Sequence, residues 1–226
     1  MALKKHLRRL YTSTLPKPLR RSIEAVIKGK YPRVFQKKGF VFIHIPKTAG
    51  KSVCQLIGVS GARHLKLSDY ERLLGRATLD KYLLFTVIRH PADRLISAWS
   101  YMKSGGNHSR EDLAFRDRWI LPYGDLDMFI QHALHQPEVA HFNRFSPQVD
   151  FLKWQDGSFS EQVIRCRFEN LEADLAQLPN FIFETSELPH INASKRPTVN
   201  FSELGREVIS TFYKEDFTLL GYKDSR

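Results

Sequence analysis

The chain has 226 residues, of which 42% are hydrophobic and 26% charged, so it is long and apolar enough to bury one globular core. This composition excludes a disordered chain, a collagen-like repeat and a small disulfide scaffold. The net charge of +11 comes from residues 1–38, which hold twelve Lys or Arg and one acidic residue, Glu24. Residues 39–226 hold 23 residues of each sign, so charge-driven binding of a polyanion would involve the first 38 residues.

Residues 1–38 place leucine, isoleucine and valine at broken helical spacing around Pro16 and Pro18, which predicts two short basic amphipathic helices. We expect this N-terminal arm to precede a single domain over residues 39–226. Two roles for the arm stay open. It binds an anionic membrane surface or another polyanion, or its apolar stripe docks on the domain.

The longest apolar runs are far shorter than the roughly 18 residues that a membrane-spanning helix needs. No continuous apolar segment follows the basic N-terminus, so we do not expect a secretory signal peptide. Cys54 and Cys166 do not form a C-x-x-C pair, and two cysteines favour a reducing compartment with buried thiols. A cytoplasmic protein is therefore expected.

Short β-rich runs that alternate with helical patterns predict βαβ units and a parallel sheet. We predict strands over residues 40–45, 82–88 and 163–168. The helices are expected directly after the loop at 46–52 and over residues 91–103, 109–119, 125–135, 169–178 and 202–212. Ligands of such sheets bind at the carboxyl ends of the strands, where the loops at 46–52 and 89–91 lie.

The loop Pro-Lys-Thr-Ala-Gly-Lys-Ser at residues 46–52 joins the first strand to a helix, as an anion site would. Gly50 lets the backbone approach a ligand closely, and the first N–H groups of the helix have no partner within it. The side chains that add positive charge or hydroxyl donors are Lys47, Lys51, Thr48 and Ser52.

The end of this loop, Gly50-Lys51-Ser52, matches the Walker A pattern G-x-x-x-x-G-K-[ST]. Ile45 stands where that pattern has its first glycine, and Pro46 follows it. The tighter loop and the additional Lys47 favour a phosphate group other than the β-phosphate of a nucleoside triphosphate. A P-loop kinase or NTPase stays the alternative.

The second strand ends in Ile88-Arg89, and an arginine fork binds a terminal phosphate through two hydrogen bonds. On the helix over 91–103, Arg94, Ser97 and Tyr101 share one face. Leu95, Ala98, Trp99 and Met102 share the other, which we expect to be buried. We assign Arg89 a functional role, and we assign Asp93 and Arg94 a structural ion pair.

Residues 44–52 and 85–99 together resemble the two nucleotide-binding signatures of the carbohydrate (Golgi-type) sulfotransferase family. The similarity continues through residues 146–152, 168–171 and 216–222. The resemblance implies a three-layer, P-loop-like α/β fold with a central, mainly parallel sheet flanked by helices. It also implies transfer of a sulfuryl group from 3′-phosphoadenosine 5′-phosphosulfate (PAPS) to a hydroxyl group, often of a carbohydrate.

The resemblance implies a binding role for particular residues. The residues that would hold the 5′-phosphosulfate are Lys47, Thr48, Ala49, Gly50, Lys51 and Ser52. Arg89 and Ser97 would hold the 3′-phosphate, although His90 stands where many relatives have Asn or Asp. Lys195 and Arg196 follow a segment that closes over the nucleotide in the family, so they are predicted to contact the 3′-phosphate or an anionic acceptor; a solvated charge pair is the alternative.

Sulfuryl transfer depends on positioning and on positive charge at the leaving oxygen. We expect Lys47 to supply that charge, with help from Lys51. We expect no metal, because the second strand ends in Ile88-Arg89 and no Asp or Glu stands there as a Walker B carboxylate would. Histidine accepts protons near neutral pH, and His64 lies between the two signatures, where family members with a base histidine have theirs. Asp69 and Glu71 are the alternative bases, and His44 is expected to be packed.

The expected partners are a hydroxylated acceptor, which we expect to be a glycan, and, through the arm, an anionic membrane surface; no nucleic-acid partner is expected. A different class of function stays open, namely a non-enzymatic protein that binds polyanions or membranes through the arm. Many family members lie in the Golgi lumen behind an N-terminal anchor, so a trimmed Golgi-lumenal enzyme is the alternative to a cytoplasmic one.

Overall fold

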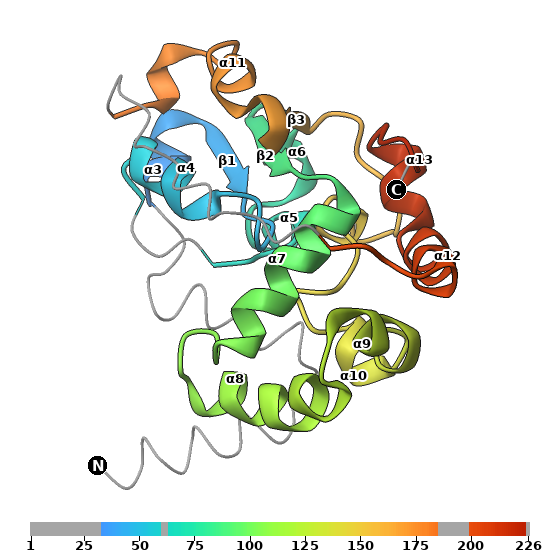
Figure 1. Ribbon diagram of the computed structural model, residues 1–226. Helices are drawn as coiled ribbons and strands as arrows, with labels where there is room; N and C mark the ends of the chain where they lie inside the picture. The colour runs from blue at the N-terminus through green and yellow to red at the C-terminus, as the bar shows by residue number, and fades with distance from the viewer. Residues whose placement is uncertain (1–32, 60–62, 185–198, 225–226) are drawn as a thin grey trace, which may run out of the picture.

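The computed structural model describes residues 33–59, 63–184 and 199–224 (Figure 1). Within these residues β1 (Phe40–Ile43), β2 (Leu83–Ile88) and β3 (Ile164–Arg167) form a parallel sheet in the order β1-β2-β3. Phe42 pairs with Phe85 and Val87 pairs with Cys166. The predicted α/β fold with a parallel sheet flanked by helices is confirmed.

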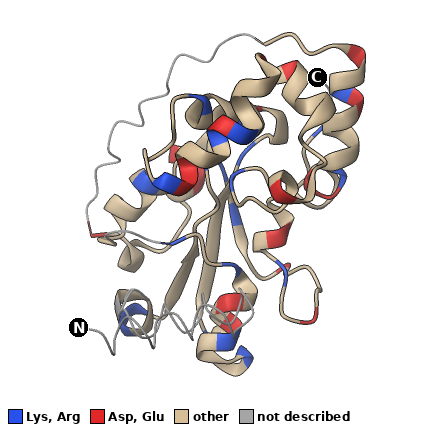
Figure 2. Ribbon diagram, turned by 90° about the horizontal axis from the view of Figure 1, so that it is seen from below, with Lys and Arg blue, Asp and Glu red and all other residues tan. Residues whose placement is uncertain are grey.

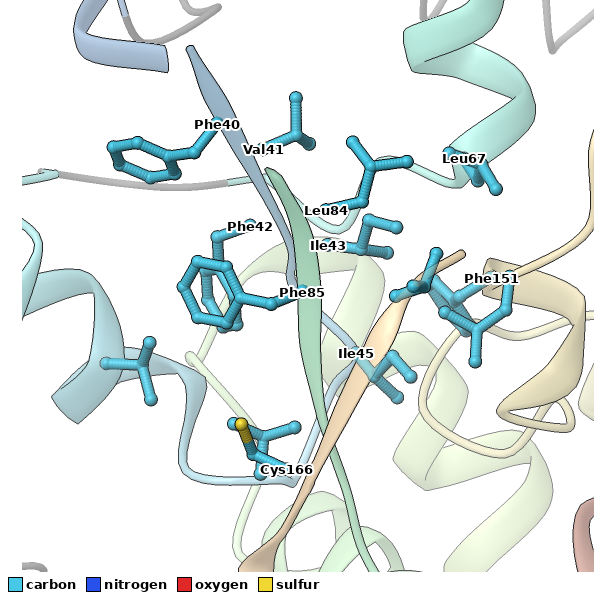
Figure 3. Packing of buried hydrophobic residues seen from close by; sticks show 14 of the residues in the cluster. Phe40, Val41, Phe42, Ile43, Ile45, Leu67, Leu84, Phe85, Phe151 and Cys166 are labelled. Atoms are coloured by element: carbon cyan, nitrogen blue, oxygen red, sulfur yellow. The ribbon is translucent and has the colours of Figure 1, made fainter. Parts of the chain in front are cut away.

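Both faces of β1 and β2 are covered, so these two strands are almost entirely apolar. Every residue of β1 is buried. Figure 3 shows Phe42 and Phe85 on one side of the strands, with their ring centres 5.0 Å apart. Ile43 and Leu84 lie on the opposite side, toward Leu67 and Phe151. Alternate residues of β1 and β2 therefore fill two layers of core, whereas the edge strand β3 has arginine at every second position and buries only Cys166.

The helices form two groups (Figure 1). Around the sheet lie α3 (Arg33–Lys38), α4 (Gly50–Leu56), α5 (Leu67–Leu74), α6 (Arg76–Leu79) and α11 (Leu171–Leu175). The second group begins with α7 (Pro91–Lys103), which leaves the end of β2, and adds α8 (Arg110–Phe115), α9 (Leu126–His132), α10 (Pro137–Ala140), α12 (Glu203–Phe212) and α13 (Lys214–Leu219). Each group encloses its own apolar cluster.

The helix predicted over residues 91–103 is confirmed at both ends, with Pro91 in its first turn. The helix predicted over 109–119 is different: α8 ends at Phe115, and a π-helical turn, η1 (Arg116–Ile120), follows. Phe115 and Ile120 are both buried although they lie five residues apart. A π turn brings that spacing to one face, whereas an α-helix does not.

The helix predicted over 202–212 is confirmed as α12, with Ser202 as its N-cap. Two other predicted helices are shorter than expected. Residues 125–135 form α9 only as far as His132, and residues 169–178 divide between the 3₁₀ turn η4 (Phe168–Asn170) and α11. Further 3₁₀ turns are η2 (Leu121–Tyr123), η3 (Val149–Phe151) and η5 (Asn180–Ile182). The helices that were not predicted are α5, α6, α10 and α13. Of these, α6, α10 and α13 have four to six residues and are too short for a clear helical period.

The end of the predicted arm packs on the sheet. Phe35 of α3 is fully buried, and its ring centre lies 5.0 Å from that of Phe40 and 6.3 Å from that of Tyr70. Residues 33–38 thus dock on the domain, whereas the leucine, isoleucine and valine stripe of the arm lies in residues 1–32, so its docking stays a prediction. Residues 1–32 lie outside the described part of the chain, so the domain boundary at residue 39 stays a prediction.

The burial of the cysteines and the distribution of charged residues agree with the expectations from the sequence. Cys54 and Cys166 are free and buried. Basic and acidic residues are interspersed along the described ribbon (Figure 2), as expected for a body without net charge. Among the residues that the structure describes, no helix is long and apolar enough to cross a membrane.

Gln148 connects the end of β2 to α13. Its Oε1 accepts a hydrogen bond from the Arg89 N–H at 2.9 Å, and its Nε2 donates to the Arg89 carbonyl at 2.8 Å. Asp216 in turn accepts the backbone N–H groups of Gln148 and Val149, each at 2.9 Å. Gln148 and Asp216 are fully buried, so these bonds form without competition from water.

Arg94 completes this buried network. It is fully buried, its Nη1 donates to the Arg144 carbonyl at 3.2 Å, and its Nη2 donates to the Ser146 carbonyl. Burial raises the pKa of Asp216, and the positive charge of Arg94 together with the hydrogen bonds opposes that rise. Arg94 is therefore structural through these two carbonyls, and it holds the chain just before Gln148. Its predicted ion pair with Asp93 stays a prediction.

Replacing Gln148 by methionine tests the importance of this connection. Gln148→Met leaves the Arg89 N–H and carbonyl without their buried partners, so we expect a loss of about 2–4 kcal/mol in the free energy of unfolding. Urea unfolding followed by circular dichroism measures it. Gln177→Met, at an exposed site, is the matched control. A loss no larger than that of the control would contradict the assigned role.

Candidate active site

The three strands end at the same edge of the sheet, and the residues that follow them contact one another. Arg89, which follows β2, donates from Nη1 to the carbonyl of Lys47 at 3.2 Å. Its guanidinium lies 4.3 Å from the ring centre of Phe168, which follows β3. The His90 N–H donates to Glu169 at 2.8 Å. The motifs at residues 44–52, 85–99 and 168–171 thus form one site.

The loop after β1 has an unusual backbone. Lys47 and Ala49 have φ angles of 70° and 65°, in the left-handed region that glycine usually occupies. Such residues cost about 1–3 kcal/mol each and persist only where the surroundings hold them. Here the Thr48 hydroxyl donates to the Ile45 carbonyl at 2.9 Å, and Arg89 holds the Lys47 carbonyl.

The Thr48 side chain therefore has a different role from the predicted one. It is fully buried, and its hydroxyl is used within the loop rather than offered to an anion. Any part of Thr48 in anion binding falls to its backbone. Lys51, in the first turn of α4, is exposed, and the Ser52 N–H donates to the Ala49 carbonyl at 3.0 Å.

Lys47 experiences the strongest electrostatic effect in the loop. Burial, followed by repulsion from Arg89, Lys51 and Arg144, lowers its pKa to about 8. Its Nζ lies 4.0 Å from the ring centre of Tyr101, whose negative face attracts the ammonium group. An anion bound among these cations would favour the protonated lysine. The site therefore concentrates positive charge in a half-buried place.

Arg144 belongs to this site but was not predicted. Its Nη2 lies 3.1 Å from Asp112, and its guanidinium lies 5.5 Å from the ring centre of Tyr101, the ring that also contacts Lys47. No motif includes Arg144, although it lies two residues before the segment 146–152. Only the fold brings it to Lys47, so no local signal in the sequence could have identified it.

His64 lies against the end of β1. Its Nδ1 is 3.0 Å from the carbonyl oxygen of His44, and the two ring centres are 4.2 Å apart. The alternative bases are engaged elsewhere. Asp69 accepts the Lys66 N–H at 3.0 Å at the start of α5, and Glu71 accepts the Gln155 N–H at 2.7 Å. His44 is buried, as predicted.

The remaining predicted residues differ in what the structure describes. Ser97 is half-buried on α7, one turn before Tyr101. Leu95, Ala98 and Met102 are buried on the opposite face, as predicted, whereas Trp99, predicted on the same face, is only half-buried. Lys195 and Arg196 lie outside the described residues, so their roles stay predictions.

His90, the departure from the family pattern, is held in place by residues near the end of the chain. Its Nε2 lies 3.3 Å from the carbonyl oxygen of Lys223, and its ring meets Phe217 and Tyr222 edge-on. Glu169, which accepts the His90 N–H, also accepts the Tyr222 hydroxyl at 3.0 Å. Within the described ranges, no three His, Cys, Asp or Glu side chains gather as a metal site would need.

Removal of Arg144 tests whether this arginine contributes to the charge around Lys47. Arg144→Gln removes one repelling cation, so we expect the pKa of Lys47 to rise above its value of about 8. A nuclear magnetic resonance titration of the lysine Cε signals measures it. Arg118→Gln is the control, because Arg118 also lies on an aromatic ring and near a carboxylate but is exposed. An unchanged Lys47 pKa in Arg144→Gln would contradict this role.

Comparison with known proteins agrees with the geometry of this edge. Residues 32–223 match the model of the sulfotransferase family. No curated protein and no solved structure gives a match. The family match spans all three strands and each motif that meets at the carboxyl edge of the sheet. The chain belongs to the sulfotransferase family.

Proposed function

We propose that this sulfotransferase transfers a sulfuryl group from PAPS to a hydroxyl group of a carbohydrate acceptor. The observation that carries the proposal is the concentration of cations around Lys47. Arg89 contacts the Lys47 carbonyl, and burial, followed by repulsion from Arg89, Lys51 and Arg144, lowers the pKa of Lys47. Such a site favours a ligand with several negative charges. PAPS has charge at both its 5′-phosphosulfate and its 3′-phosphate.

Each end of the donor has its own residues in this proposal. The residues that bind the 5′-phosphosulfate are Lys47, Lys51, Ser52 and the backbone of Thr48, Ala49 and Gly50. Arg89 and Ser97 bind the 3′-phosphate. Lys195 and Arg196, which lie outside the described residues, are proposed to contact it as well. The contact between Arg89 and the Lys47 carbonyl supports this division, because it links the two binding regions.

The chemical step needs one positive group and one base. A bond forms between the acceptor oxygen and sulfur, and the bond between sulfur and the bridging oxygen breaks. Lys47 stabilises the negative charge that develops on the bridging oxygen. His64 accepts the proton of the acceptor hydroxyl. Its contact with the His44 carbonyl supports this role, because His44 lies at the end of β1, three residues before Lys47.

The proposed acceptor and compartment rest on the sequence motifs and the cysteines. The carbohydrate acceptor follows from the resemblance of residues 44–52 and 85–99 to carbohydrate sulfotransferases. The basic residues 1–32 are proposed to attract an anionic acceptor or membrane surface as an accessory function. The cytoplasm is the proposed compartment, supported by two free, buried thiols.

Isothermal titration calorimetry with the product nucleotide, 3′-phosphoadenosine 5′-phosphate, tests the donor. We expect it to bind at least about ten-fold more tightly than ATP with magnesium, a difference near 1.4 kcal/mol. Preference for ATP would instead favour a P-loop kinase or NTPase and would refute the proposal.

The same titration on Arg89→Ala tests the contact with the 3′-phosphate. This variant should lose affinity for the 3′-phosphorylated nucleotide more than for its 3′-hydroxyl analogue, adenosine 5′-phosphate. Arg76→Ala is the matched control, because Arg76 also stacks on an aromatic ring, Trp154, but lies on α6, before β2 begins. Equal losses for the two nucleotides would remove Arg89 from the 3′-phosphate site.

Replacement of His64 separates binding from transfer. His64→Ala should retain affinity for 3′-phosphoadenosine 5′-phosphate and lose transfer of labelled sulfate by about 100-fold or more, since the general base is absent. His141→Ala is the control, because the Nδ1 of His141 also lies near a carbonyl oxygen, that of Pro137, but at an exposed site. Turnover by His64→Ala equal to that of the control would exclude His64 as the base.

A further inference from the structure

His44 contacts two parts of the site at once, and neither contact was assigned a role by the motifs. Its carbonyl lies 3.0 Å from Nδ1 of His64. Its ring lies beside Gly50, the first residue of α4. The residue follows β1 directly and is 7% exposed, so the main-chain and side-chain contacts both come from a rigid, buried position.

The carbonyl contact determines which ring nitrogen of His64 has the proton. A carbonyl oxygen only accepts hydrogen bonds, so Nδ1 of His64 must be the donor at this distance. In a neutral imidazole the other nitrogen then has the lone pair. Neutral His64 is thus held with Nε2 as its basic atom, and the base acquires a fixed tautomer and orientation.

The ring contact determines what residue 50 can be. A β-carbon placed on Gly50 would lie 1.9 Å from Cδ2 and 2.0 Å from Nε2 of His44. The His44 ring is restrained from moving aside, because Phe42 stacks on it at 5.7 Å between ring centres and His64 lies 4.2 Å away. Gly50 therefore also accommodates His44, in addition to the ligand approach that its position in the loop indicates.

We propose that His44 is a positioning residue for sulfuryl transfer. Its carbonyl holds His64 in the Nδ1–H tautomer, and its ring fixes the distance between His64 and the start of α4, where the anion loop ends. The inference rests on the proposed function only for the role of His64 as the base. The tautomer and the steric contact with Gly50 are properties of the protein without substrate.

The tautomer is measured on the full chain with ¹⁵N-labelled histidine. Two-bond and three-bond ¹H–¹⁵N correlations at a pH where His64 is neutral should show the proton on Nδ1. The His64→Ala variant assigns the signals by loss of one set. A proton on Nε2 of neutral His64 would overturn the proposal, whatever reaction the protein catalyses.

The steric contact is tested by enlarging the residue at position 50 and then reducing the side chain at position 44. Gly50→Ala should lower both the melting temperature and the affinity for 3′-phosphoadenosine 5′-phosphate, because the new methyl group displaces the His44 ring. His44→Ala with Gly50→Ala should recover at least half of both losses, since the small residue at position 44 accommodates that methyl group. A double variant no better than Gly50→Ala alone would overturn the steric part.

Transfer assays test the positioning role itself. His44→Ala keeps the backbone carbonyl but removes the ring that packs against His64, so it should lower kcat by about ten-fold or more. His44→Phe restores an aromatic ring at this position, so it should recover most of that loss. If His44→Phe is folded and as slow as His44→Ala, a ring nitrogen is required and the proposal is wrong. If the unaltered protein transfers no sulfuryl group, the proposed function fails, and the tautomer and exchange experiments still decide the role of His44.

Discussion

Repulsion between cations is the constraint that the architecture of this site must satisfy. Three parallel strands end at one edge and bring Lys47 and Arg89 together, with Arg144 nearby. Each charge rests on an aromatic face: Lys47 and Arg144 on Tyr101, and Arg89 on Phe168. Aromatic faces attract cations without neutralising them. The aromatic contacts thereby hold Lys47 and Arg89 in place without cancelling their charge, whereas Arg144 is also paired with Asp112 at 3.1 Å.

The support behind these cations is buried and polar. Gln148 fixes the backbone of Arg89 through two hydrogen bonds, and Asp216 fixes the backbone of Gln148. Arg94 holds the preceding turn through two carbonyls. Because the side chains of Gln148, Asp216 and Arg94 are fully buried, a misplaced partner would leave a polar group unsatisfied. This requirement makes the position of Arg89 far more definite than a surface arginine would be.

The sequence was sufficient to predict those features that depend on residues close together in the chain. The strands, the helix over 91–103 and the loop at 46–52 have local patterns, and the structure has them at those places. Arg144 and the double role of Gly50 could not be predicted. Arg144 acts through Tyr101 and Asp112, which lie 43 and 32 residues before it, and the obstacle to a side chain at Gly50 is a ring from the preceding strand end. The π turn after α8 was missed because residues 109–119 were assigned to one α-helix, and the shared burial of Phe115 and Ile120 comes from the fold.

The connection through Gln148 has a consequence for how the chain is made. Gln148 follows Arg89 by 59 residues, and Asp216 follows Gln148 by 68. During synthesis from the N-terminus, the anion loop and Arg89 emerge long before the carboxylate that completes their support. Domains generally fold as units during synthesis. The cationic edge is therefore finished only when α13 has left the ribosome, so the nascent chain holds its repelling charges without their final support until then.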